Sequence, residues 1–270
     1  MTFTPTLVCV HAHPDDEALF TAGITSFYAD LGYHVVLVTC TNGQLGIDNH
    51  GHPGAHPEHD ALVTRSVRAG ELQLAAKVAG FSRVVTLGFD DSGMKGWPQN
   101  EAPNAFVRVD VDAVARTLAA IMDEVHATVV VTYDENGFYG HPDHIKANVV
   151  TRRALDFAAS PARLYYPVVP KSVLEAFIEG ATAKGVFLPA WILDASHHVD
   201  DQLVATTMDV RSFAKRKHQA IATHASQIDN ADLVTMDEEL FALLFGTEYY
   251  QRAWSRSVTT GDETDLFGGL

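Results

Sequence analysis

The chain has 270 residues, and its hydrophobic fraction of 47% is ordinary for a soluble globular protein. Its 34 acidic residues outnumber the 19 basic ones, which gives a formal net charge of −15. Proteins that bind nucleic acid concentrate basic residues on one surface, so this balance excludes nucleic acid as a partner. The one basic run, at 215–218, falls inside a predicted helix, where a solvated helix face is the simpler interpretation.

The N-terminal residues MTFTPTLVCV have neither the basic nor the long apolar segment of a secretory signal peptide. No run of about 18 apolar residues occurs, so we expect no membrane partner. The two cysteines, Cys9 and Cys40, are too few for a disulfide framework, and both lie in apolar runs typical of buried, inert thiols. These features predict a cytoplasmic protein.

Short apolar runs rich in β-branched residues alternate with longer helical patterns. The predicted strands are 6–11, 34–40, 83–89, 128–133 and 163–169, and the predicted helices between them are 16–31, 60–79, 111–125 and 143–159. Runs that are apolar on both faces suit strands buried in a parallel sheet. The alternation therefore predicts an α/β fold, Rossmann-like and doubly wound, with a mostly parallel sheet.

The pattern is less regular beyond residue 169. Helices are predicted at 171–184, 211–226 and 236–246, the stretch 190–210 stays unassigned, and the tail 257–270 is expected to be mobile. No repeat or low-complexity linker divides the chain. We therefore predict a single domain over 1–270, with a Rossmann-like core at 1–169 and a C-terminal elaboration at 170–270.

Histidines and carboxylates follow two of the predicted strands. The first strand runs into His-Ala-His-Pro-Asp-Asp-Glu (11–17) instead of the glycine-rich turn of a dinucleotide-binding domain, and the fourth is followed by DENGFYGHPDH (134–144). In the common doubly wound order these strands are neighbours, and ligands bind at their carboxyl ends. Both clusters are therefore expected in one crevice.

A divalent cation would offset the carboxylates gathered in this crevice. Imidazole and carboxylate ligands favour zinc, or a neighbouring metal such as Fe²⁺, over Mg²⁺ or Ca²⁺. His13 and Asp16 can reach one ion from a strand-to-helix turn, and on spacing alone either His141 or His144 supplies the third ligand. Two histidines, one carboxylate and an open position form a catalytic pattern, with Asp15 free to act as a general base on a water molecule.

Two neighbouring features have plainer interpretations. Glu17 is expected to cap the following helix and to hold a ligand histidine in its tautomer. The histidine-rich stretch HGHPGAHPEH (50–59) follows no strand and is rich in Gly and Pro, so it is predicted to be a solvated loop over the crevice and not a second metal site. Its histidines remain candidates for contact with substrate.

The motifs AHPDDE and YGHPDH resemble those of the zinc-dependent de-N-acetylases of the LmbE-like, GlcNAc-phosphatidylinositol de-N-acetylase superfamily. The likeness is nearest to the mycothiol-pathway branch, which comprises a deacetylase acting on an N-acetylglucosaminyl inositol and the mycothiol S-conjugate amidase. Further segments resemble that branch in order: VTCTNG, RAGEL (68–72), DDSGM (90–94), VVVTYDENGFYGHPDH (129–144) and HASQ (224–227). The resemblance spans most of the chain.

This resemblance implies roles for eight residues. The implied zinc ligands are His13, Asp16 and His144. The implied catalytic residues are Asp15 as general base, with His141 and Tyr139 facing the oxyanion; whether His141 is also a general acid stays open. The implied binding residues for the sugar or its aglycone are Arg68 and Asp91.

Two positions depart from the family pattern. Phe20 stands where the family is often glycine-rich, and it is expected to narrow the pocket. Gln44 stands near a position where the mycothiol branch tends to carry an acidic residue, which leaves the aglycone open. The change at Gln44 does not affect the metal chemistry.

We therefore expect a metal-dependent N-deacetylase that removes an N-acetyl or N-acyl group from a glucosamine-containing small molecule, with one Zn²⁺ (or Fe²⁺) per chain. The alternatives are an amidase acting on a mycothiol-type conjugate, a deacetylase that tailors a secondary metabolite and, from another class, a non-catalytic sugar-binding domain. The intact acid–base set argues against the last. The expected partner is a small amino sugar, and a homo-oligomer is compatible with the sequence.

Overall fold

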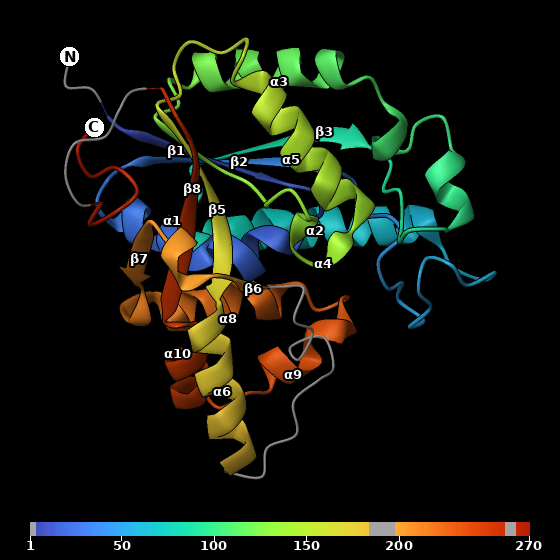
Figure 1. Ribbon diagram of the computed structural model, residues 1–270. Coiled ribbons are helices and arrows are strands. Elements are labelled where there is room, and N and C mark those ends of the chain that lie inside the picture. The colour runs from blue at the N-terminus through green and yellow to red at the C-terminus, as the bar shows by residue number, and fades with distance from the viewer. Residues whose placement is uncertain (1–3, 184–197, 257–262) are drawn as a thin grey trace.

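The computed structural model describes residues 4–183, 198–256 and 263–270, and a mixed sheet forms its centre (Figure 1). The strand order is β3-β2-β1-β4-β5-β8-β7, with β6 paired to β5. The parallel part consists of β1 (Thr6–His11), β2 (His34–Thr41), β3 (Arg83–Phe89), β4 (Val129–Val131) and β5 (Arg163–Pro170). The short β6 (His198–Val199) is also parallel, whereas β7 (Thr206–Asp209) and β8 (Thr247–Ser255) are antiparallel.

Helices cover both faces of the sheet (Figure 1). On one face lie a π-helical turn (Glu17–Thr21), α1 (Ala22–Asp30), α2 (Ala61–Ala79), α8 (Ala214–Thr223) and α10 (Glu238–Phe245). On the other lie α3 (Val111–Glu124) and α5 (Pro142–Ala154). The other α-helices of the described residues are α4 (Gly137–Gly140), α6 (Lys171–Ala183) and α9 (Ala231–Val234). Among the described residues, no helix combines the length and apolarity needed to cross a membrane.

Helix α2 shows how local sequence sets the bounds of an element. The side chain of Asp60 accepts a hydrogen bond from the backbone N–H of Val63 (3.0 Å), which satisfies a donor that the first helical turn leaves free. Gly80 ends the helix in the left-handed region at φ 90°, which glycine adopts without a Cβ clash. The helix predicted at 60–79 is thereby confirmed.

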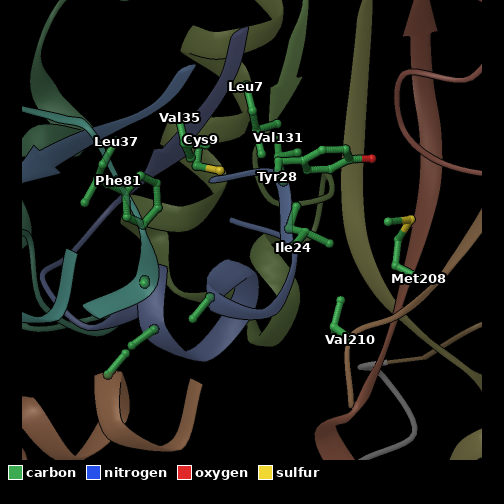
Figure 2. Packing of buried hydrophobic residues seen from close by; sticks show 14 of the residues in the cluster. Leu7, Cys9, Ile24, Tyr28, Val35, Leu37, Phe81, Val131, Met208 and Val210 are labelled. Carbon is green, nitrogen blue, oxygen red and sulfur yellow. The ribbon is translucent and has the colours of Figure 1, made fainter. Parts of the chain in front are cut away.

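Alternation along β1 builds two apolar layers. Leu7 and Cys9 belong to the layer on the side of α1 and α2 (Figure 2), whereas Val8 and Val10 belong to the layer on the side of α3 and α5. Both cysteines, Cys9 and Cys40, are buried free thiols, and burial raises the pKa of each well above its ordinary value. The predicted fold class, a doubly wound and mostly parallel sheet, is confirmed, as is the burial of the thiols.

The C-terminal third differs from the expectation in three places. Strand β8 was not predicted, because its mixed polar and apolar side chains resemble no buried parallel strand. The unassigned stretch 190–210 contains β6 and β7, although 190–197 lies outside the described residues. The prediction of a mobile tail is wrong for 263–270, where Leu266 and Phe267 are buried in the same apolar layer as Leu7. Residues 257–262 lie outside the described part.

The basic run at 215–218 is not a uniformly solvated face. Lys217 is buried, and its ammonium lies 2.7 Å from Oε1 of Glu248. Glu248 in turn accepts hydrogen bonds from the backbone N–H groups of Gly23 and Ile24 at the start of α1. The sequence pattern missed this pair because its partners lie 31 residues apart. The cluster therefore stabilises the contact between α8, β8 and α1.

Candidate active site

The register of the sheet brings the two motifs together. Strands β1 and β4 pair in parallel from Leu7↔Val129 to Cys9↔Val131, so the segments that follow them leave the sheet at the same edge. Beyond this edge, the chain after β1 carries His13 and Asp16, and the chain after β4 leads into α5, which carries His144. All three side chains are buried. The expected convergence of the two clusters is therefore present.

Three pairs of donor atoms face one another at this point. Nδ1 of His13 lies 3.3 Å from Nε2 of His144 and 3.4 Å from Oδ2 of Asp16. Oδ1 of Asp16 lies 3.3 Å from Nε2 of His144. A tetrahedral ion with bonds of about 2.0–2.1 Å keeps its ligand atoms roughly 3.3–3.4 Å apart. The pairwise spacings therefore suit a zinc-type ion, with Asp16 presenting a different oxygen to each histidine.

The hydrogen bonds of the two candidate histidines at the start of α5, His144 within the helix and His141 as its N-cap residue, distinguish their roles. Nδ1 of His144 lies 3.2 Å from the carbonyl oxygen of Gly137, so that nitrogen carries the proton and Nε2 keeps its lone pair. Nδ1 of His141 instead accepts a hydrogen bond from the backbone N–H of Asp143 (3.1 Å), so its Nε2 carries the proton. His144 is thus prepared to bind a cation, and His141 is prepared to donate a hydrogen bond.

A carboxylate holds His13 in place through the ring nitrogen that does not face Asp16 and His144. Nε2 of His13 lies 3.2 Å from Oδ2 of the buried Asp143, which directs Nδ1 toward Asp16 and His144. Burial disfavours the imidazolium of His13, but Asp91, Asp143 and Asp16 together outweigh it and raise its pKa. Ser92 fixes Asp143 through its backbone N–H (2.8 Å) and hydroxyl (2.5 Å). This carboxylate–histidine arrangement is typical of metal centres.

Asp16 also has a fixed orientation. Its Oδ2 accepts hydrogen bonds from the hydroxyl of Tyr133 (2.5 Å) and from the backbone N–H of His13 (2.7 Å). The ring of Tyr133 also stacks on the ring of His144, with centroids 4.0 Å apart. Burial opposes ionisation of Asp16, yet His144 and His13 outweigh burial and hold its pKa well below the ordinary value. One tyrosine thus orients two of the three donors.

Asp15 lies beside the donors in an unusual backbone conformation, with φ 115°. Its Oδ1 lies 3.0 Å from Nη2 of Arg68, whose guanidinium also donates to the carbonyl oxygens of Pro14 and Gly43. Burial raises the pKa of Asp15 to about 6 against the opposing effect of Arg68. Arg68 itself is only 3% exposed, so the structure places this predicted sugar-binding residue against Asp15.

The rings of His141 and Tyr139 lie beside that of His144, with centroids 5.2 and 4.9 Å away. One ring nitrogen from each of His13, His141 and His144 lies within 4.8 Å of the other two. Burial, together with His13 and His144, lowers the pKa of His141 to about 2, which favours the neutral ring. Tyr139 is 42% exposed. The turn before it has positive φ values at Gly137 (64°) and Phe138 (62°).

Asp91 and the two positions that depart from the family pattern also border this site. Oδ1 of Asp91 lies 3.6 Å from Nε2 of His13, and its backbone N–H donates to Oε1 of Gln44 (3.0 Å). Phe20 packs its ring against those of Tyr133 and His144, with centroids 5.5 and 6.1 Å away. Phe20 therefore supports the rings that orient the donors.

The loop 50–59 is organised by the buried Asp48. This carboxylate accepts hydrogen bonds from the backbone N–H groups of His50, His52 and Asp60. The rings of His52 and His56 stack nearly parallel, with centroids 4.1 Å apart. These two rings and Glu58 form a group of potential ligands at a second location. That this loop is not a second metal site stays a prediction.

Sequence reasoning missed Asp143 and Tyr133 and assigned Glu17 a role that the structure does not show. Asp143 and Tyr133 lie inside the quoted motif VVVTYDENGFYGHPDH, so the motif itself was the available signal. Glu17 was expected to hold a ligand histidine, and that prediction is wrong: it accepts a hydrogen bond from the backbone N–H of Asp15 (3.0 Å) and lies 2.7 Å from Nε2 of His224. Burial opposes charge on His224, but Glu17 outweighs it and raises the pKa of that ring.

Comparison with known proteins agrees with this geometry. Residues 8–155 match the family model described as PIG-L, GlcNAc-PI de-N-acetylase. Over an alignment 304 positions long, the chain is 38% identical to the 1D-myo-inositol 2-acetamido-2-deoxy-alpha-D-glucopyranoside deacetylase of Geodermatophilus obscurus. The alignment covers 100% of this chain and 99% of the relative. It is 36% identical to deacetylase 1 of the same description from Catenulispora acidiphila, with 98% and 89% covered.

Solved structures share the fold at low sequence identity. The N,N'-diacetylchitobiose deacetylase of Pyrococcus horikoshii is 17% identical, with a TM-score of 0.57 over 92% of this chain and 82% of that one. The 4-carboxy-2-hydroxymuconate hydratase GalB of Pseudomonas putida, also 17% identical, has a TM-score of 0.64 over 96% and 100%. One fold thus carries two reactions, so it does not decide the chemistry. The family match over more than half of the chain and the full-length relatives do: the chain belongs to the PIG-L family of de-N-acetylases and is a hydrolase of that class.

Proposed function

We propose that this protein is a zinc-dependent hydrolase that removes the N-acetyl group from a small glucosamine-containing molecule, with Asp15 as its general base. The convergence of Nδ1 of His13, the carboxylate of Asp16 and Nε2 of His144, all 3.3–3.4 Å apart, is the observation that carries the proposal. These three residues would hold the cation. Two imidazoles and a carboxylate suit Zn²⁺ or Fe²⁺.

The chemistry divides between the cation and the residues around it. A bound Zn²⁺ supplies Lewis acidity, which lowers the pKa of water toward 7 and polarises a carbonyl oxygen. Asp15 takes the proton from the attacking water and afterwards delivers it to the leaving amine. Arg68 holds the Asp15 carboxylate in place for both transfers.

The carbonyl oxygen gains negative charge as the amide carbon becomes tetrahedral. Nε2–H of His141 donates to that oxygen, since Nδ1 of this ring already accepts the backbone N–H of Asp143. The hydroxyl of Tyr139 is the second donor, and its partial exposure leaves it accessible to an incoming substrate. The low pKa of His141 favours a hydrogen-bond donor over a general acid.

The sugar is proposed to be an N-acetylglucosaminyl inositol. This assignment rests on relatives that are 36–38% identical over nearly the whole chain and are described as deacetylases of that compound. Asp91 borders the site and is the proposed contact for the sugar or its aglycone. An amidase acting on a mycothiol-type conjugate and a deacetylase that tailors a secondary metabolite are the alternatives, and a solved deacetylase of teicoplanin biosynthesis shares the fold with a TM-score of 0.59.

We further propose that residues 1–270 form one domain. Side chains from both parts of the chain share one apolar layer, in which Met208 and Val210 lie beyond Ile24 and Tyr28 (Figure 2). A separate C-terminal unit would close its own core instead.

The test is release of primary amine from a panel of N-acetylglucosaminides, each with and without a chelator. The panel contains an inositol pseudodisaccharide, an aryl glycoside, an aminoglycoside precursor and a cysteinyl-glucosamine amide. We expect chelator-sensitive release from the inositol compound, restored by added Zn²⁺. Release from the cysteinyl-glucosamine amide alone would establish the amidase instead. Chelator-insensitive release would refute the role of the metal.

A further inference from the structure

Asp15 has a backbone conformation that needs support from outside its own segment. A φ of 115° is uncommon for a residue with a side chain, and such residues persist where surrounding contacts hold them. If Asp15 relaxed to a negative φ, its carboxylate would turn away from Arg68. The carboxylate of Asp15 therefore stays beside Arg68 only while the backbone of Asp15 is held in place.

The carbonyl oxygen of Asp15 accepts the backbone N–H groups of Ala18 and Leu19 in the following turn, and the side chain of Glu17 contacts its N–H. Oε2 of Glu17 accepts a hydrogen bond from the N–H of Asp15 (3.0 Å), and its Oε1 lies 2.7 Å from Nε2 of His224. Glu17 is fully buried, and His224 is 2% exposed. The two ends of one carboxylate thus connect the segment of the general base with a residue 207 positions further along the chain.

The segment that carries His224 is itself anchored. The backbone N–H and hydroxyl of Ser226 donate to the two oxygens of Glu71 on α2 (2.8 and 2.7 Å). The side chain of Gln227 contacts both the N–H and the carbonyl oxygen of Ile47. His224 follows α8, and Ser226, two residues further on, links this segment to α2 through Glu71. Helix α2 also carries Arg68. Both groups that fix Asp15 are therefore tied to the same helix.

We propose that Glu17 and His224 are positioning residues for the reaction: together they hold the main chain of Asp15 so that its carboxylate faces the reacting water. The inference rests on the proposed function only in naming Asp15 as the base. It assigns the HASQ segment a role in catalysis without contact with substrate or metal. Glu17 is the residue that acts, and His224 keeps its carboxylate in place.

The first test is hydrogen exchange, which needs no substrate. In Glu17→Ala we expect faster exchange in a peptide spanning 12–20, because the N–H of Asp15 loses its acceptor, and unchanged exchange in a peptide spanning 22–30. Glu248→Ala is the matched control, since Glu248 is also a buried glutamate that joins a residue of α8 to backbone N–H groups. It should show the opposite pattern. Unchanged exchange in 12–20 of Glu17→Ala would overturn the proposal.

The second test separates positioning from a structural role. We expect Glu17→Ala to lower kcat about 10²-fold with KM and bound metal nearly unchanged, as misplacing a catalytic group by about 1 Å can do. In an Asp15→Asn background the same substitution should change kcat less than about threefold, because both act through one carboxylate. A full additional loss in that background would refute positioning through Asp15.

Two further variants keep the test decisive if Glu17→Ala does not fold. Glu17→Gln retains an oxygen that can accept the N–H of Asp15, so it should restore kcat to within about tenfold of wild type. His224→Ala leaves Glu17 in place but unanchored, and should accelerate exchange in 12–20 while lowering kcat about tenfold. Normal exchange and kcat in His224→Ala would refute its part. A wild-type protein inactive on the whole panel would refute the proposed function, whereas hydrogen exchange would still decide the inference.

Discussion

Replacing His141, the N-cap residue of α5, and His144, in its first turn, separates a metal ligand from a hydrogen-bond donor. Nε2 of His144 has a free lone pair facing Asp16 and His13, whereas Nε2 of His141 carries a proton. We therefore expect His144→Ala to lose zinc affinity and His141→Ala to retain it. Both side chains are buried, so the variants remove similar volumes from the same helix.

The magnitude follows from the number of ligands. Zinc held by four ligands in small peptides is bound by about 10–16 kcal/mol, or about 2.5–4 kcal/mol per ligand. Since about 1.4 kcal/mol corresponds to a factor of ten, His144→Ala should weaken zinc binding roughly 10²–10³-fold. His141→Ala should weaken it less than about tenfold, because Nδ1 of that ring accepts the backbone N–H of Asp143 and Nε2 carries the proton, so neither nitrogen has a lone pair to give.

The assay is competition with a chromogenic chelator, followed by zinc per chain after dialysis. His144 also stacks on Tyr133, so the metal-free stability of both variants is measured first, and affinities are compared below both melting temperatures. Wild-type affinity in His144→Ala would refute the ligand assignment. An equal loss in both variants would refute the argument from the two tautomers.

Four further substitutions test the site and the fold. Asp15→Asn should keep one zinc per chain and lose about 10²–10⁴-fold in turnover, because an amide cannot accept the proton; loss of zinc as well would make Asp15 a ligand. Tyr139→Phe should lower kcat about 10²–10³-fold if the hydroxyl stabilises the oxyanion, with the melting temperature unchanged because the side chain is partly exposed; a change in KM alone would move Tyr139 to substrate binding. Asp143→Asn should weaken zinc affinity about 10–100-fold because the amide holds His13 less well. If the chelator removed zinc from this variant at the same concentration as from the wild type, the prediction would be contradicted. Lys217→Ala should lower the free energy of unfolding in urea by about 3–5 kcal/mol, since Glu248 keeps its buried charge without a cation, while kcat of the folded fraction is unchanged; a difference under about 1 kcal/mol would show that the pair is dispensable.

Local pattern was sufficient to predict the parallel core and the location of the site. The five predicted strands correspond to β1–β5. Their apolar, β-branched runs are buried on both faces in β1, β2, β4 and β5, whereas the edge strand β3 is only partly buried. The doubly wound order then made neighbours of β1 and β4, which brought His13 and His144 to the same edge. The prediction failed for β8, whose side chains have no distinct period, and for the end of the chain, where Leu266 and Phe267 are buried by contacts distant in sequence.

The amino-acid sequence by itself determined which chemical groups meet at the site, because residue type and strand order suffice for that. Only the tertiary structure decided what each group can do. The carbonyl oxygen of Gly137 sets the tautomer of His144, and the backbone N–H of Asp143 sets the opposite tautomer of His141. Spacing alone left these two histidines equivalent, because a ring's protonation depends on the atom that faces it. The contact of Glu17 with His224 was beyond reach for the same reason: its partner is 207 residues away, and only the packing of α8 on the core brings it there.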